Sequence, residues 1–60
     1  MPNRLWRVVA PHFVAGVVVR MDGSIAQCAP ILGWLKSRGE PWPRLRALLR
    51  SRGYEVTQIG

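Results

Sequence analysis

The sequence is poor in the residues that most enzymes and metal sites use. Among its 60 residues there is one cysteine, Cys28, and one histidine, His12. A single cysteine cannot form an internal disulfide, and a structural zinc site normally takes four Cys or His ligands. The fold must therefore be held together by side-chain packing, or by a partner or a second copy.

Acidic residues are scarce as well, because Asp22, Glu40 and Glu55 are the only three. No two of them are placed as an acid–base or metal-binding pair, and the six glycines are too dispersed to form a phosphate-binding loop. A pair of Cys28 and His12 lacks a third orienting group, and Cys28 belongs to a predicted apolar face, where a thiol stays protonated. We therefore predict no enzymatic activity, no cofactor and no bound metal.

A long hydrophobic segment is also missing. The longest apolar stretch, Val8–Val19, is interrupted by Pro11 and His12 and is much shorter than the ~20 residues that span a bilayer. A hydrophobic share of 48% is that of a globular chain, and 60 residues suffice for one small domain, 1–60. We expect a cytoplasmic protein that does not enter membranes, since a lone cysteine fits a reducing compartment.

The clearest local signal is the segment 21–24, Met-Asp-Gly-Ser, which lies between two apolar runs. Asp-Gly at this place favours a two-residue hairpin turn, in which both central residues have positive φ. That turn places Val19 opposite Ala26 and Val17 opposite Cys28. One face of the hairpin then carries Phe13, Ala15, Val17 and Val19, and the other carries Val14, Gly16, Val18, Arg20, Ile25 and Gln27.

Two short helices follow the hairpin, and each is bounded by proline and glycine. The first begins at Pro30, ends at Gly39, and places on one side Ile31, Leu32, Trp34 and Leu35. The second begins near Pro43, ends at Gly53, and has an apolar stripe of Leu45, Leu48 and Leu49. Segments 4–9 and 54–59 are rich in strand formers, and the two terminal strands are expected to be neighbours. The predicted fold is α+β in the order β-β-β-α-α-β: a small antiparallel sheet of the hairpin plus terminal strands, with both helices on one face.

Charge is strongly unbalanced towards the basic side. Nine Lys and Arg against three Asp and Glu give a net charge of +6, with a pI of about 11.5. Eight of the nine cations are arginine, whose planar guanidinium matches phosphate or carboxylate in a bidentate way. Arg46 and Arg50 lie about 40° apart on one flank of the second helix, with Arg44 on the other side of its polar arc. We predict that the surplus positive charge gathers on one exterior helical flank. The candidate contact cations are Arg7, on a predicted strand, and Lys36, Arg38, Arg44, Arg46 and Arg50, on or after the predicted helices.

Three tryptophans are many for a chain of this length. Trp34 lies on the apolar stripe of the first helix and is expected in the core. Two interpretations are open for the other two tryptophans. Trp6 lies on a predicted edge strand, and Trp42 lies between two prolines. Each either covers the core or serves as an exposed stacking or interface anchor, because bases and partner proteins both stack on such rings. Trp42 is the preferred anchor, since Pro41 and Pro43 hold it.

A run of hydrophobic and turn residues resembles a group of known sequences. The segments 10–16 (APHFVAG), 22–23 (DG) and 29–32 (APIL), followed by Trp34, are similar to short uncharacterised basic proteins encoded in phage and prophage genomes. The resemblance covers roughly half of the chain and carries no catalytic signature. It implies a phage context, in which small proteins often bind host machinery without enzymatic activity, including CRISPR effectors and other nucleoprotein complexes.

These observations lead to one main hypothesis and two alternatives. The main hypothesis is a non-enzymatic module that binds nucleic acid or a nucleoprotein through its arginine-rich helix face, led by phosphate contacts. In the first alternative the same arginines meet an acidic patch, and the protein inhibits a host complex, as an anti-CRISPR or other host-takeover protein does. In the second, the chain is a small structural subunit that completes its core in a homo-oligomer through exposed strand edges.

Overall fold

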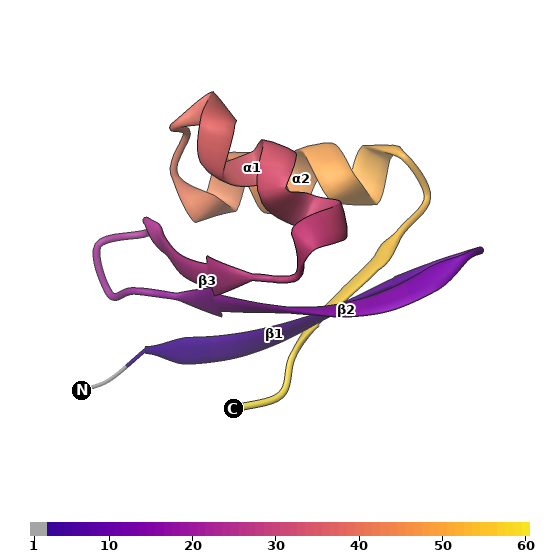
Figure 1. The fold of residues 1–60 in the computed structure, drawn as a ribbon, viewed down its shortest axis with the longest axis horizontal. Coiled ribbons are helices and arrows are strands. Elements are labelled where there is room, and N and C mark those ends of the chain that lie inside the picture. The colour runs from indigo at the N-terminus through magenta and orange to yellow at the C-terminus, as the bar shows by residue number, and fades with distance from the viewer. Residues whose placement is uncertain (1–2) are drawn as a thin grey trace.

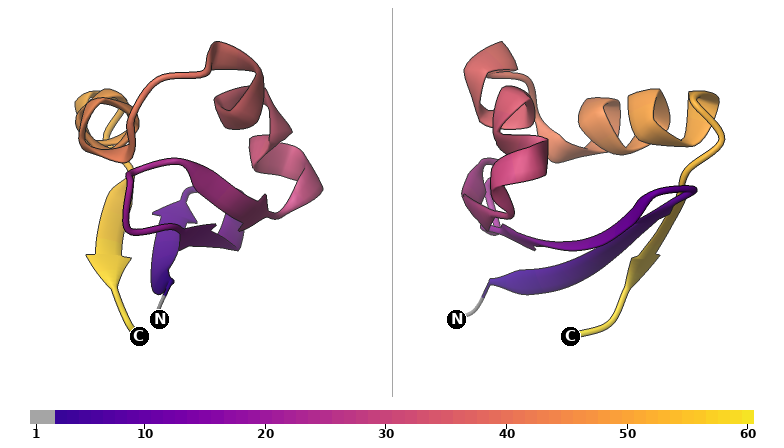
Figure 2. Two further views of the ribbon diagram at one scale, coloured as in Figure 1. Left: turned by 90° about the vertical axis from the view of Figure 1, so that its left-hand side faces the viewer. Right: turned by 45° about the vertical axis from the view of Figure 1, so that its right-hand side comes forward.

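The computed structural model describes residues 3–60, which form an antiparallel sheet with helices on one of its two faces (Figures 1 and 2). The four strands are β1 (Arg4–Ala10), β2 (Phe13–Val19), β3 (Ile25–Cys28) and β4 (Glu55–Gln58). Between β3 and β4 lie a 3-10 turn, η1 (Pro30–Leu32), and the helices α1 (Gly33–Arg38) and α2 (Trp42–Ser51). The predicted α+β fold and element order are confirmed, with η1 as an addition.

The two terminal strands are neighbours, as predicted. The strand order is β3-β2-β1-β4, so β1 pairs with β2 on one side and with β4 on the other. The expectation that the strand of Trp6 is an edge strand is therefore wrong, because the chain returns from α2 to pair with β1. The pairing continues past β4, where the backbone N–H of Leu5 donates to the carbonyl of Gly60 at 3.1 Å. The two edges of the sheet are β3 and β4.

The turn between β2 and β3 is longer than the two-residue turn predicted. Gly23 has a φ of 89°, but Asp22 does not share its positive φ. The Gly23 N–H donates to the carbonyl of Arg20, and the Arg20 N–H donates to that of Ser24. This is the pattern of a three-residue loop that ends in a left-handed glycine. The Asp22 carboxylate accepts from the backbone and the hydroxyl of Ser24, which holds the turn closed.

The longer turn changes the register of the hairpin at its closed end. Val17 pairs with Cys28, as predicted, but Val19 pairs with Ile25 in place of Ala26, and the register shifts between Val18 and Val19. Ile25 consequently lies on the core side of the sheet, only 8% exposed, although it was assigned to the outer face. The shift exchanges alanine for a larger apolar side chain in the core, which removes more apolar surface from water.

The core lies between the sheet and the two helices. Its buried side chains come from alternate positions of the strands and from one side of each helix: Trp6, Val8, Ala15, Val17, Val19, Ile25, Leu32, Leu35, Trp42, Leu45, Leu49 and Val56. Leu48 is only half-buried. Ile31, expected on the same side as Leu32 and Leu35, is 54% exposed. That prediction fails because the 3-10 geometry of η1 has about three residues per turn and breaks the helical periodicity before α1.

The start of α2 explains the position of Trp42. The helix begins at Trp42, one residue earlier than predicted, with Pro41 in an extended conformation before it. Pro43 occupies the first turn, where a missing N–H leaves no hydrogen bond unmade. The Trp42 N–H donates to the carbonyl of Gly23 at 2.8 Å, which ties α2 to the turn between β2 and β3. Gly39 ends α1 in the left-handed conformation, as predicted, with a φ of 66°.

Candidate functional site

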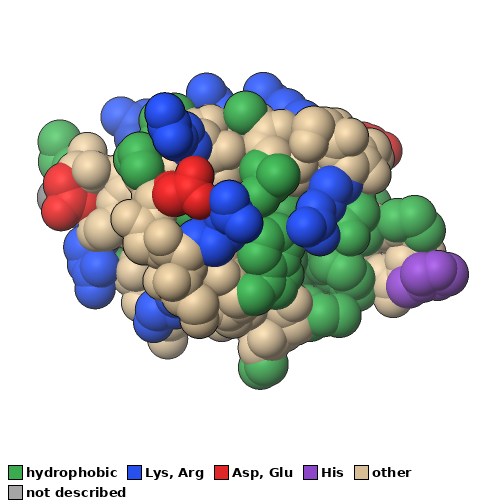
Figure 3. Space-filling view, turned by 90° about the horizontal axis from the view of Figure 1, so that it is seen from above, with side chains coloured by type: hydrophobic (Ala, Val, Ile, Leu, Met, Phe, Trp, Pro, Cys, Tyr) green, Lys and Arg blue, Asp and Glu red, His purple; other side chains and the backbone are tan. Residues whose placement is uncertain are grey.

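The helix-bearing side of the molecule carries most of the cationic residues. We call six of them the helix-layer cations: Lys36, Arg38, Arg44, Arg46, Arg50 and Arg52. Figure 3 shows Lys and Arg side chains at several separate places on this side, with apolar surface between them. The prediction that the cations gather on one flank is therefore wrong. They extend over both helices and the segment that follows α2.

Two helix-layer cations lie over tryptophan rings. The guanidinium carbon of Arg46 is 5.3 Å from the centre of the Trp6 ring, and that of Arg52 is 4.7 Å from the centre of the Trp34 ring. Cation–π contacts at this range are worth about 0.5–1 kcal/mol at exposed sites. Each contact restrains a guanidinium group against an uncharged ring, so the contact itself brings no negative charge to neutralise it.

Two others make polar contacts with their own chain. Arg50 donates from Nη2 to the backbone carbonyl of Val56 at 2.8 Å, which links α2 to the edge strand β4. Arg38 pairs with Glu40 through Nε and Oε2 at 2.6 Å. Both carboxylate and guanidinium of this pair are partly exposed to solvent, so it contributes little to stability. It does neutralise one positive charge of the helix layer.

The remaining two helix-layer cations are unengaged. Within residues 3–60 the side chains of Lys36 and Arg44 make no hydrogen bond, ion pair or cation–π contact. Both are exposed to solvent. Arg44 lies on α2 on the side away from Arg46 and Arg50, since the three residues follow the 100° step of the helix. The polar arc of α2 thus carries arginine on each flank, with Ala47 exposed between them.

Arg7 does not belong to the helix layer. It pairs with Gly16 on β2 and Thr57 on β4, and it lies on the sheet face that no helix covers (Figure 2). We call this the open sheet face; its other members follow from the same pairings and are Leu5, Val9, Val14, Gly16, Val18, Gln27, Glu55 and Thr57. Val14 is 65% and Leu5 39% exposed. The predicted contact cations are therefore divided between two opposite faces of the molecule.

The two tryptophans predicted as possible stacking anchors are part of the core. Trp6 is 8% and Trp42 4% exposed, and their ring centres lie 5.4 Å apart. Their indole N–H groups are also buried and have no acceptor among the described residues. Neither ring has a free face for a base or for a partner protein. Of the two alternatives, covering the core is the one that the structure supports.

Arg52 is a site residue that the sequence analysis did not select. It follows α2 directly, and its position on the helical spiral is on the flank opposite Arg46. Its contact with Trp34 connects the end of α2 to α1. The 100° step of the helix predicts the flank on which Arg52 lies. It does not predict the contact with Trp34, because that ring comes from a different helix.

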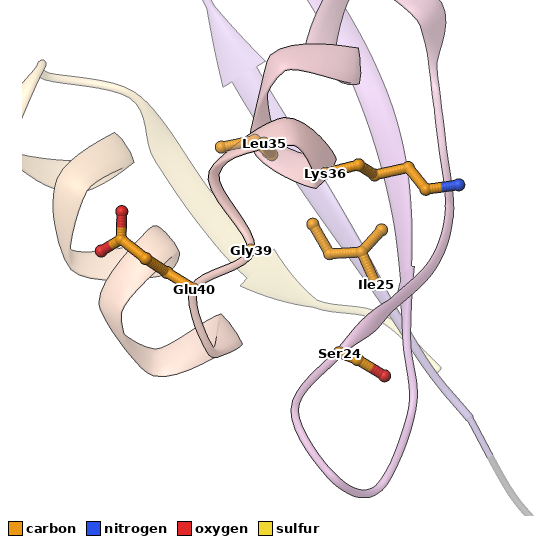
Figure 4. Close-up of a pocket in the computed structure, with 6 residues that line it drawn as sticks. All are labelled: Ser24, Ile25, Leu35, Lys36, Gly39 and Glu40. Atoms are coloured by element: carbon orange, nitrogen blue, oxygen red, sulfur yellow. The ribbon is translucent and has the colours of Figure 1, made fainter.

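One shallow cavity of about 160 Å³ lies between β3 and the end of α1 (Figure 4). Its volume is below the ~300 Å³ at which ligand pockets usually begin. Ile25 and Leu35 give it an apolar floor, while the charged ends of Lys36 and Glu40 point away from it. The cavity therefore lacks the converging polar groups that bind a substrate.

Metal-ligating side chains are not clustered within residues 3–60. No three His, Cys, Asp or Glu side chains come close enough to hold a metal ion. Cys28 is half-buried against the core, and its thiol donates to the carbonyl of Leu32 at 3.6 Å. Hydrogen bonds from Ser24 lower the pKa of the Asp22 carboxyl below its ordinary value of 3.8, which keeps this turn residue charged.

The helices of the described part are also too short or too polar to cross a lipid bilayer. Comparison of the chain with protein-family models found no match, and comparisons with curated proteins and with solved structures found no significant match either. The chemistry and placement of its own side chains therefore carry the functional conclusion.

Proposed function

We propose that the protein is a non-enzymatic module that binds the phosphate backbone of nucleic acid, free or within a nucleoprotein complex, through its helix-layer cations. The observation that carries this proposal is uncompensated charge. The chain has a net charge of +6, and among the described residues Arg38 is the one helix-layer cation with a carboxylate partner. Binding of this kind is weakly sequence-specific, because phosphates are common to all sequences.

The contacts made by Arg46 and Arg52 favour this function. A guanidinium carries five N–H donors, and within the described residues neither Arg46 nor Arg52 uses any of them in an ion pair, because each lies over a tryptophan ring. A side chain that is already held against a ring loses less conformational freedom when it meets a phosphate. Both arginines are in this sense prearranged for anion binding. The phage resemblance is in keeping with a cytoplasmic site of action.

Salt dependence is the first test of the proposal. The measurement is fluorescence anisotropy of labelled mixed-sequence DNA and RNA, titrated with the protein at several salt concentrations. If four to six phosphates are neutralised, affinity should fall about 100- to 1,000-fold between about 50 and 200 mM salt. Absence of binding at low salt, with a folded protein by circular dichroism, would overturn the proposal.

A matched pair of variants locates the binding face. Arg44→Glu and Arg7→Glu make the same change of charge at exposed arginines, one on α2 and one on the open sheet face. Neither side chain makes an ion pair within residues 3–60, so neither substitution should unfold the protein. Arg44→Glu should weaken binding about tenfold at low salt, and Arg7→Glu should have a clearly smaller effect. Equal effects would contradict the assignment to the helix layer.

A second candidate function is protein binding through the open sheet face. The specific observation is that apolar side chains, among them Leu5 and Val14, stay exposed around Arg7 at the middle of this face. An antiparallel sheet that is open on one side is normally polar on that side. Two copies facing each other there would bring their Arg7 side chains together, so an acidic partner, such as a host complex that the protein inhibits, fits better than a homo-oligomer.

The second candidate makes its own predictions. Host proteins captured by the wild type after nuclease treatment should be lost with Arg7→Glu and with Val14→Asp, and retained with Arg44→Glu. Light scattering should report a monomer. A dimer that Val14→Asp dissociates would favour the oligomeric subunit, and capture that depends on Arg44 would instead place the partner on the helix layer.

A further inference from the structure

All five aromatic rings of the chain pack against another side chain. Trp6 and Trp42 are buried against each other, and Phe13 meets Tyr54 edge to face with ring centres 5.9 Å apart. Trp34 is only partly buried, but the guanidinium of Arg52 lies over its ring at 4.7 Å. The two buried tryptophan rings therefore offer no free face to a ligand, and the other three rings are each engaged with a neighbouring side chain.

The open sheet face has no aromatic residue either. Its members are aliphatic, small, polar or charged, as the pairings of β1 with β2 and β4 place them. Proteins that bind single-stranded DNA or RNA commonly stack the unpaired bases on exposed aromatic rings, often on such an open sheet. The open sheet face of this molecule does not provide that platform. An unpaired base has no aromatic ring to stack on there, so a single strand would gain little beyond contacts with its phosphates.

The cations of α2 are arranged to meet phosphates on two sides. Arg44 lies on one flank of the helix, and Arg46 and Arg50 lie on the other. Between these flanks Ala47 and Ser51 are exposed and short, so they do not hold a ligand away from the arginines. A duplex presents phosphates along both edges of a groove, and the major groove of B-form DNA admits a helix. A duplex also carries about twice the charge per length of a single strand.

We infer that the ligand class of the helix layer is double-stranded nucleic acid, bound through phosphates by both arginine flanks of α2 and without stacking on unpaired bases. This inference rests on the proposed function. It adds the strandedness of the ligand and makes α2 the central contact element.

The test compares one labelled sequence in single-stranded and double-stranded form by fluorescence anisotropy at low salt. The duplex should bind at least tenfold tighter than either of its strands. Equal or tighter binding of a single strand would overturn the inference while leaving the proposed function intact. Binding of neither form by the folded protein would overturn the proposed function itself. A duplex RNA of the same sequence is measured alongside the duplex DNA. Tighter binding of the DNA would indicate that the protein recognises B-form geometry, and equal binding would indicate that it recognises the phosphate backbone common to both duplexes.

Two variants with the same added charge test the role of α2. Ala47→Glu places a carboxylate between the two arginine flanks, and Ser37→Glu places one on α1. Both positions are exposed, so both variants should keep the far-ultraviolet circular dichroism of the wild type. Ala47→Glu should weaken duplex binding at least tenfold, and Ser37→Glu should weaken it less than threefold. Equal losses in the two folded variants would overturn the assignment of α2 as the contact element.

Discussion

Two apolar residues at the first helical segment, Ile31 and Leu35, give a sharp test of how the chain packs. Their spacing of four residues would put both on one side of a regular helix, where their replacement by alanine should have similar effects. In the structure Leu35 has no exposed surface, whereas Ile31 is 54% exposed. The free energies of unfolding of the two alanine variants should therefore differ strongly.

The magnitudes follow from burial. Leu35→Ala removes buried methyl groups and leaves a cavity, which costs about 2.7–5 kcal/mol in comparable sites. A chain of this length has a total stability of about 3–9 kcal/mol, so the variant should lose a third of it or more, and Tm should fall by about 10 °C or more. Ile31→Ala truncates a side chain that is half in water and introduces a better helix former. Its loss should stay below about 1 kcal/mol.

Urea denaturation followed by circular dichroism measures both values under one set of conditions. The slope of free energy against urea must be the same in all variants, so that the midpoints report stability alone. Leu35→Met keeps most of the buried volume and serves as the control, with an expected loss below about 1.5 kcal/mol. Similar losses for Ile31→Ala and Leu35→Ala would refute the separation of these two residues by the 3-10 turn.

Three further predictions concern the backbone, a carboxylate and a sheet edge. Gly53 has a φ of 87° and open space around its Cβ position, so Gly53→Ala should destabilise the protein by about 1–2 kcal/mol through backbone strain. Gly33 has a helical φ of −56°, so Gly33→Ala should stabilise the protein by about 0.5–1 kcal/mol in the same urea titration. The pKa of Asp22 is lowered from 3.8 in the folded state, so its stabilising effect is present above that value and is lost as pH falls through the folded-state pKa. Asp22→Asn should reduce this loss of stability in acid. Carboxyl NMR of the folded protein should give a titration midpoint below 3.8 for Asp22. Arg50→Ala leaves the Val56 carbonyl on the edge strand β4 without its hydrogen-bond donor, so self-association through this edge should increase in light scattering. Unchanged scattering would show that Arg50 does not protect this edge.

The parts of the fold that could be predicted from the sequence are those with strong local signals. The Asp-Gly turn between two apolar runs and the glycines after both helices identify the elements, and their order follows. The register at Ile25 could not be predicted, because Asp-Gly suits turns of two and of three residues. A difference of one residue in the turn moves the next side chain to the opposite face of the sheet.

The site was less predictable than the fold, because the state of each arginine depends on contacts between distant segments. Composition reveals the excess of positive charge, and helical spacing places Arg46 and Arg50 on one flank. Neither indicates that Trp6, some forty positions earlier, lies beneath Arg46, since that contact exists only once β1 is covered by α2. The burial of Trp42 depends in the same way on tertiary structure, because α2 must start one residue before Pro43 for that ring to reach the core.

The structural contacts of the arginines are compatible with the proposed binding role because most of their internal partners are uncharged. A tryptophan ring or a backbone carbonyl fixes a guanidinium without removing its charge, as at Arg46 and Arg50. A carboxylate would fix it and neutralise it, and Arg38 is the helix-layer cation in the described chain with such a partner. With three acidic residues against nine basic ones, the chain stabilises its surface mainly by contacts that preserve the positive field. An anionic ligand would then meet side chains that are already ordered and still charged, which is the physical basis for placing the binding surface on the helix layer.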